Sequence, residues 1–172
     1  EMDREVPPGT DAKAYEAAFR ARYADRMAEL ARRLAAEPGV AAVTFAADVP
    51  GVEASGAVEV PGARTPPAGG AGHPVRFSGV DAGFFGAFGI PVLAGRPFGA
   101  GDPGAASTAV IVNRTFVQKV LGGGGALGRR VRYVGRDRWM EAGGAADSLP
   151  GRWHEIVGVV GDLPAATMDG SE

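Results

Sequence analysis

Residues 80–98, VDAGFFGAFGIPVLAGRPF, decide the fold, because they read as a short helix, an abrupt stop, a short strand and a turn. Asp81 can accept hydrogen bonds from backbone N–H groups at the start of this helix. Gly89 stands where a left-handed residue ends a helix, and Pro91 prevents the helix from resuming. The apolar residues after Pro91 predict a strand that ends in a turn at Gly95. These residues specify structure and offer no reactive group, which argues against an enzyme.

Two helices with one apolar side are expected. In the short helix, Phe84, Phe85 and Phe88 are spaced so that their rings lie on one side. Over residues 11–37, apolar side chains recur at steps of three and four, which predicts a long amphipathic helix with a solvated charged face. Its stripe consists of Tyr15, Phe19, Tyr23, Met27, Leu30 and Leu34. Thr10 is the expected N-cap, and Pro38-Gly39 the expected end.

Besides the strand after Pro91, short strands are predicted at 40–46, 58–60, 74–80, 108–112, 128–134 and 155–160. The run at 40–46 is almost entirely apolar, so we expect it to be buried on both faces. Asn113 can cap a helix over 114–121. Strands and helices mix without strict βαβ alternation, which favours the α+β class over a doubly wound sheet.

Composition limits the class of protein. The chain has 172 residues, 45% of them hydrophobic, which is enough for a buried core. Its net charge of −2 gives no overall positive field, so we expect no nucleic-acid partner. No apolar run approaches the roughly 20 residues of a membrane-spanning helix, and no signal peptide is visible. Cysteine is absent, which excludes disulfides, thiol catalysis and Cys-ligated metals.

Patterns that could carry chemistry are better explained as structure. The glycine run at 122–125 follows a helix and lacks the Lys and Ser/Thr of a phosphate loop, so we interpret it as a helix C-cap. The sequence GVVGD at 158–162 lacks the dinucleotide-binding spacing. His73 and His154 belong to no metal motif, and we expect them at surface or strand-edge positions. No serine lies in a GxSxG elbow.

Charged side chains give no clear site either. Caps and turns explain most of the scattered carboxylates, although a pair acting as acid and base stays open; these are Asp48, Glu53, Glu59, Asp81, Asp102 and Asp162. Arg129, Arg130 and Arg132 indicate a solvated strand face, with an acidic partner or a lipid headgroup as the alternative. We therefore predict no catalytic, cofactor-binding or metal-binding residue, and no cofactor.

Four segments, in order, resemble the periplasmic core domain of MacB/FtsX-type ABC transporter permeases. The first is 80–98, with its aromatic pair, Gly-Ile-Pro step, short strand and Gly-Arg-x-Phe turn. The others are the strand AVIVN that ends at Asn113, the Leu-Gly-Arg step in ALGRRV at 126–131, and the return strand WHEIVGVVGD at 153–162. The amphipathic helix with Pro38-Gly39-Val40 after it also fits. The resemblance covers most of the chain.

The resemblance implies a two-lobed extracytoplasmic α+β domain. Residues 1–50 would supply the long helix and first strand of a porter-like lobe. Residues 51–152 would form a second, smaller α+β lobe inserted into it. Residues 153–172 would hold the return strand and a truncated end of the porter-like lobe. The chain would then be a soluble fragment of an integral protein of the bacterial inner membrane, on its extracytoplasmic side.

The resemblance also implies a mechanical, non-enzymatic function. A separate ATPase subunit or domain would move the membrane helices, and this domain would transmit the motion. The helix at 11–37 would be the lever, while the insertion at 136–152, with Trp139-Met140, would contact partners. The implied partners are a second permease copy or half, the ATPase, and a periplasmic adaptor or lipoprotein. The alternatives are a soluble ligand- or protein-binding sensor or adaptor module, and a hydrolase that uses the scattered carboxylates.

Overall fold

The computed structural model describes residues 11–48, 53–67, 70, 72–99, 101–102, 107–134 and 151–163. The chain divides into two compact units, Glu1–Val43 and Thr44–Glu172, which we call the helical unit and the sheet unit. The helical unit contains α1 (Ala12–Ala35). The elements of the sheet unit are β1 (Ala54–Glu59), β2 (His73–Phe77), α2 (Phe84–Ala87), β3 (Val92–Gly95), β4 (Ala109–Asn113), α3 (Arg114–Lys119), β5 (Arg130–Val134) and β6 (Trp153–Val160).

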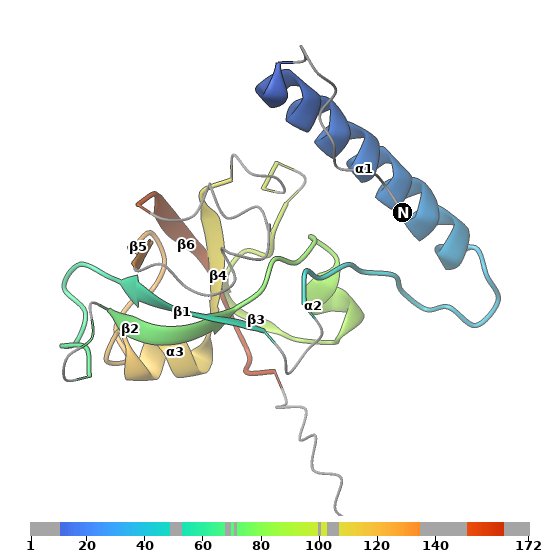
Figure 1. The fold of residues 1–172 in the computed structure, drawn as a ribbon. Helices are drawn as coiled ribbons and strands as arrows, with labels where there is room; N and C mark the ends of the chain where they lie inside the picture. Colours follow the sequence, from blue (N-terminus) through green and yellow to red (C-terminus); the bar gives the residue numbers. More distant parts are fainter. Residues whose placement is uncertain are drawn as a thin grey trace, which may run out of the picture. The chain divides into compact units, whose positions relative to one another are not determined.

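The strands of the described chain form one six-stranded sheet in the order β2-β1-β5-β6-β3, with β4 also beside β6 (Figure 1). β6 is the central strand, because it pairs with β5 and β3 in antiparallel fashion and with β4 in parallel. β1 connects β5 to β2 through two antiparallel ladders. Helices and mixed strand directions in one sheet confirm the α+β class.

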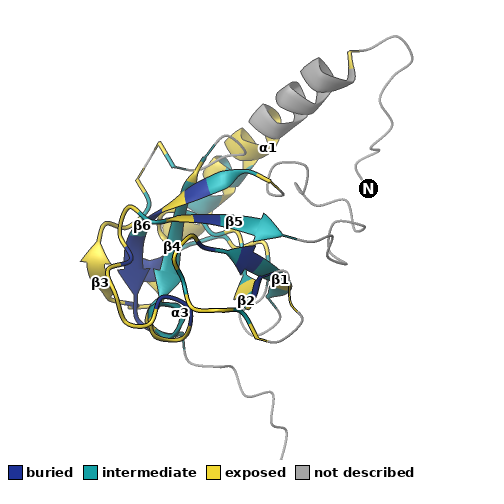
Figure 2. Cartoon of the chain, turned by 90° about the vertical axis from the view of Figure 1, so that its left-hand side faces the viewer, coloured by how far each residue is buried: buried dark blue, intermediate teal, exposed yellow. Residues whose placement is uncertain are grey.

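The larger hydrophobic core lies where α3 and the residues that follow it pack on the sheet. Its strand residues are Val58 of β1, Val131 of β5, and Ile156 and Val159 of β6, and Ile156 is fully buried. The other buried residues of this core lie outside the strands and are Val60, Val120, Leu121 and Ala126. Figure 2 shows the resulting contrast, with β6 largely dark blue and β3 yellow at the edge of the sheet. Burial of these aliphatic side chains is the main source of stability here.

A smaller core surrounds α2. Phe84 and Phe85 are buried with Ile90 and Val160, the last residue of β6. The rings of Phe84 and Phe85 meet edge to face, with their centroids 5.6 Å apart. The ring centroids of Phe84 and Phe88 are 4.8 Å apart, but Phe88 is 53% exposed, so of the three rings predicted on one side of the helix two are buried.

Local stop and cap signals are confirmed. Asn113 has extended backbone and its side-chain oxygen accepts from the Phe116 amide at 2.9 Å, which caps α3. Gly89 has φ +63° directly after α2, in the left-handed region that suits glycine. Gly122 and Gly123, both with positive φ, follow α3 as the expected C-terminal stop. Thr10, the predicted cap of α1, lies outside the described residues.

The predicted strand at 40–46 is wrong. In this segment only Ala46 makes a β-bridge, to Val80, and Val40 is 39% exposed. Apolar composition alone does not make a buried strand, because a strand needs a neighbour to pair with, and the segment crosses from the helical to the sheet unit at Val43. Residues 44–47 alone find a partner, and that partner is a loop.

Candidate functional site

The residues singled out for chemistry do not converge on one centre. In the described part of the chain, no three or more His, Asp or Glu side chains are grouped as metal ligands would be. The carboxylates instead serve separate elements. Asp162 accepts from the Thr115 amide at 2.9 Å near the start of α3, and Glu59 pairs with Arg132 at 2.5 Å. Glu53 lies 3.7 Å from Arg76 on the neighbouring strand.

Both histidines are buried, which contradicts the surface or edge positions expected of them. His73 is 6% exposed, and its Nε2 lies 2.8 Å from the Arg64 carbonyl oxygen. His154 is 3% exposed and meets the Tyr133 ring edge to face at 5.7 Å. Strand pairing explains this burial, because His73 lies opposite Val58 and His154 opposite Val131, both core residues.

Burial changes the acid–base behaviour of the pair His154 and Tyr133. It lowers the pKa of His154, with a smaller contribution from the positive charge of Arg152. Burial also raises the pKa of Tyr133 to about 12. His154 Nε2 has no hydrogen-bond partner among the described residues, so a proton there would be poorly accommodated. The geometry favours a neutral core imidazole over a general base.

The basic cluster at 129–132 is largely used within the molecule. Arg132 stacks over the Trp153 ring, 4.8 Å from its centroid, while its Nη2 pairs with Glu59. Arg129 donates from Nη2 to the Pro61 carbonyl at 2.7 Å. Arg130 is exposed. Two of the three guanidinium groups therefore hold neighbouring segments together, which the sequence pattern did not indicate.

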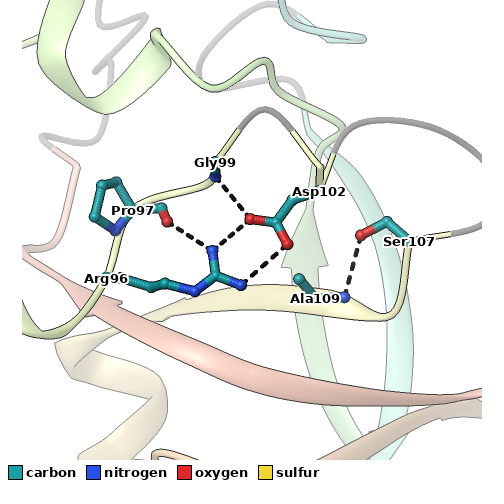
Figure 3. A network of polar contacts seen from close by, with 6 residues as sticks. All are labelled: Arg96, Pro97, Gly99, Asp102, Ser107 and Ala109. Carbon is teal, nitrogen blue, oxygen red and sulfur yellow. Dashed lines mark hydrogen bonds and ion pairs between the residues drawn. The ribbon is translucent and has the colours of Figure 1, made fainter.

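A polar network closes the loop after β3, as Figure 3 shows. Arg96 Nη1 pairs with Asp102 Oδ2, and Nη2 donates to Oδ1 at 3.1 Å. The Gly99 amide donates to Asp102 Oδ2 at 2.7 Å, and Arg96 also reaches the Pro97 carbonyl. The hydrogen bonds from Arg96, then that from Gly99, lower the pKa of Asp102 to about 2. This exposed network holds the loop closed, and its acceptors, the Asp102 carboxylate and the Pro97 carbonyl, receive hydrogen bonds from within the loop.

A further set of polar contacts lies where the chain enters the sheet unit. Thr44, Phe45 and Ala47 lie against Gly79 and Asp81 and exchange hydrogen bonds with them. The Asp81 carboxylate accepts from the Gly83 amide at 3.0 Å. Gly83 itself is the N-cap of α2 and no side chain caps this helix, so the prediction that Asp81 caps it is wrong, and Asp81 instead closes the turn before α2. It also accepts from Thr44 and Phe45, contacts that the sequence did not reveal. The one sequence signal for these contacts is Thr44, a hydroxyl residue within the apolar run at 40–46.

Two further predicted features are the insertion at 136–152, expected to contact partners, and the apolar stripe of α1. Trp139, Met140 and most of the insertion at 136–152 lie outside the described residues. On α1, Tyr23, Leu30 and Leu34 of the predicted apolar stripe are exposed, while Arg33 donates to Glu29 one turn earlier at 2.6 Å. Among the described helices, none combines the length and apolar character needed to cross a bilayer.

The chain is similar to a known family of domains and to two solved structures. The family model for MacB-like periplasmic core domains matches residues 5–171. A comparison with curated proteins gives no match. Among solved structures, the periplasmic region of MacB from Actinobacillus actinomycetemcomitans is similar, with 17% identity, 77% of this chain and 49% of that chain covered, and a TM-score of 0.49.

A second solved structure is a domain assigned to a permease protein from Porphyromonas gingivalis. It shares 22% identity with this chain, covers 69% of it, and is itself covered over 47% of its length, with a TM-score of 0.35. The chain thus spans about half the length of both structures.

Proposed function

The chain belongs to the family of MacB-like periplasmic core domains, and from this premise we propose that it is a non-catalytic extracytoplasmic domain of an ABC transporter permease in the bacterial inner membrane. It transmits conformational change from the membrane helices, which a separate ATPase subunit or domain moves. Its partners are a second permease copy or half and a periplasmic adaptor or lipoprotein. The family match over residues 5–171 is the observation that carries this proposal.

The geometry of α1 supports a role as lever. Its 24 residues give a rod of about 36 Å, and a continuous hydrogen-bond ladder resists bending. It forms a compact unit of its own rather than a part of the sheet unit. Its exposed Tyr23, Leu30 and Leu34 are apolar surface that a partner helix could cover.

The interactions of the carboxylate side chains support a non-catalytic role. Asp81, Asp102 and Asp162 are engaged in turns and helix starts, and the glutamates Glu53 and Glu59 pair with arginines. Each of these groups stabilises a local element, and a carboxylate that already accepts two or three hydrogen bonds is a poor general base.

Cross-linking in a permease that contains this domain tests the proposal. The chain has no cysteine, so Ala28→Cys, at an exposed position of α1, gives a single reactive thiol within it. We expect the disulfide yield between two copies to differ between nucleotide-free and ATP-trapped states, because α1 moves with the membrane helices. Gln118→Cys, exposed on α3, is the matched control for random collision.

An equal yield for Ala28→Cys in both states would contradict the lever role. Calorimetry of the isolated chain with ATP is the companion experiment, and we expect no heat of binding. Micromolar affinity for the nucleotide would contradict the assignment of ATP hydrolysis to a separate subunit or domain.

A further inference from the structure

The chain enters the sheet unit through a small antiparallel contact between residues 44–47 and 79–81, which we call the sheet junction. The Ala47 amide donates to the Gly79 carbonyl at 2.7 Å, and the Asp81 amide donates to the Phe45 carbonyl at 3.0 Å. Ala46 and Val80 form the single bridge between them. A pairing this short is weak by itself, because β-structure gains stability from extended ladders and a packed face.

The Asp81 side chain supplies what the short pairing lacks. Its Oδ2 accepts from the Phe45 amide at 3.0 Å. Its Oδ1 accepts from the Thr44 hydroxyl and, at 3.0 Å, from the Gly83 amide. Hydrogen bonds to an ionised acceptor are stronger than neutral ones. One carboxylate therefore ties Thr44 and Phe45 to the start of α2, which lies more than thirty positions away in the sequence.

The sheet junction rests on the smaller core. Val80 packs against the cluster of Phe84, Phe85, Ile90 and Val160, and Val160 is the last residue of the central strand β6. Next to it, the Gly161 amide donates to the Pro91 carbonyl at 3.1 Å. The contacts from Thr44 through Asp81 to β6 are thus contiguous. A displacement of residues 44–45 is resisted by this packed cluster, not by a loose loop.

We propose that Asp81 is a positioning residue that fixes the point at which the chain from α1 enters the sheet unit, an inference that rests on the proposed role of α1 as a lever. A residue that only closed the turn before α2 would need only the Gly83 amide. The two bonds to residues 44 and 45 go beyond that need. They join the segment after α1 and the start of α2 into one body.

Hydrogen exchange of the full chain tests this role. In Asp81→Ala, the amides of Phe45 and Ala47 should exchange roughly tenfold to a hundredfold faster, since the two charge-assisted bonds to residues 44 and 45 are lost. The Ile156 amide in the larger core should keep its rate. Thr44→Val removes only the hydroxyl and should give a smaller increase, which vanishes when Asp81→Ala is already present.

Asp102→Ala is the matched control. The Asp102 carboxylate also binds three donor groups, two on Arg96 and the Gly99 amide, but it joins no segment to the sheet junction. Exchange at Phe45 and Ala47 should therefore stay at the parent rate in this variant. A rate increase there equal to that of Asp81→Ala would mean that the effect is general, and would overturn the proposal.

A disulfide rescue separates the bonds of Asp81 to residues 44 and 45 from its bond to the Gly83 amide before α2. Ala46 and Val80 form a non-hydrogen-bonded antiparallel pair, for which a Cα separation of about 4.5 Å suits a disulfide. Ala46→Cys with Val80→Cys, added to Asp81→Ala, should restore slow exchange at Phe45 and Ala47 once oxidised, and reduction should abolish the rescue. Oxidised chains that still exchange fast would show that Asp81 acts on α2 alone.

These outcomes are independent of the proposed function. Exchange at Phe45 and Ala47 within twofold of the parent in Asp81→Ala would overturn the positioning role, whatever the permease does. A positive junction result together with state-independent cross-linking of Ala28→Cys would instead reject the lever and leave the anchoring role of Asp81 in place.

Discussion

At the scale of the residue, Gly95, the last residue of β3, has the most crowded surroundings of the described glycines with positive φ. It has φ +73°, and a Cβ atom there would lie 2.3 Å from the Val157 carbonyl oxygen and 2.6 Å from Leu127 Cδ2. Gly89 shares the left-handed backbone, at φ +63°, but a methyl group added there would meet nothing within 4 Å. A substitution at Gly89 therefore introduces backbone strain alone, whereas one at Gly95 adds a steric collision.

We expect Gly89→Ala to lower the free energy of unfolding by about 1 kcal/mol, the cost of a left-handed non-glycine residue. Gly95→Ala should cost about 3 kcal/mol or more, because Val157 or the strand pairing must shift as well. Urea unfolding of both variants measures the difference. Equal losses in the free energy of unfolding would show that the close approach of Gly95 to β6 does not contribute to stability.

His154 makes stability depend on pH. Its pKa is lowered in the folded protein, so at pH 8 both the folded and unfolded states hold a neutral imidazole. As the pH falls below the ordinary value of about 6.5, the unfolded chain binds a proton that the folded chain does not. The free energy of unfolding should then decrease, by at most about 1.4 kcal/mol per pH unit from this one group.

The measurement is urea unfolding between pH 8 and pH 5, well above the range in which Asp102, with its pKa of about 2, loses its charge. His154→Asn should flatten the dependence on pH, because it removes the group whose pKa is lowered. A parent protein equally stable at pH 8 and pH 5 would contradict the burial of His154 in a neutral form.

At the scale of the element, α3 depends on its N-cap. The helix runs only from Arg114 to Lys119, too short to persist without its cap and the packing of Phe116 and Val117 on the larger core. Asn113→Ala should lower the free energy of unfolding by about 1 kcal/mol, and Asn113→Asp should restore most of it, because a carboxylate oxygen can also accept from the Phe116 amide. Thermal unfolding of the two variants checks this, and an equal loss in both would exclude the cap.

Elements with local signals could be predicted from the sequence. Asn113 before α3, Gly89 after α2 and the apolar recurrence of α1 each act within a few residues, so their effects can be read without knowing the partners. α1 ends at Ala35, slightly before the expected stop at Pro38. The strands β3 and β6 likewise lie within two residues of their predicted positions.

Features that depend on distant pairing could not be predicted. The segment at 40–46 has the composition of a strand, but only Ala46 meets a partner. His154 is polar and begins a strand, yet its register with Val131 turns it into the core. The bonds from Asp81 to Thr44 and Phe45 cross between segments whose proximity no local pattern indicates. Each failure is one of register or partner choice, not of local conformation.

At the scale of the whole molecule, the two units differ in what holds them together. All buried residues of both hydrophobic clusters come from the sheet unit. The apolar residues Tyr23, Leu30 and Leu34 of α1 belong to neither cluster. We therefore expect the stability of the sheet unit to be independent of α1.

Removal of residues 1–43 tests this independence. We expect the remaining chain to unfold cooperatively with a free energy within about 1 kcal/mol of the parent, because no residue of either cluster is lost. The control is Ile156→Ala, which opens a cavity at the fully buried centre of the larger core and should cost about 3–4 kcal/mol. Chemical unfolding followed by tryptophan fluorescence compares the three proteins. A truncated chain as unstable as Ile156→Ala would mean that α1 is a structural part of the sheet unit, and a helix bound into the core could not move against it as a lever.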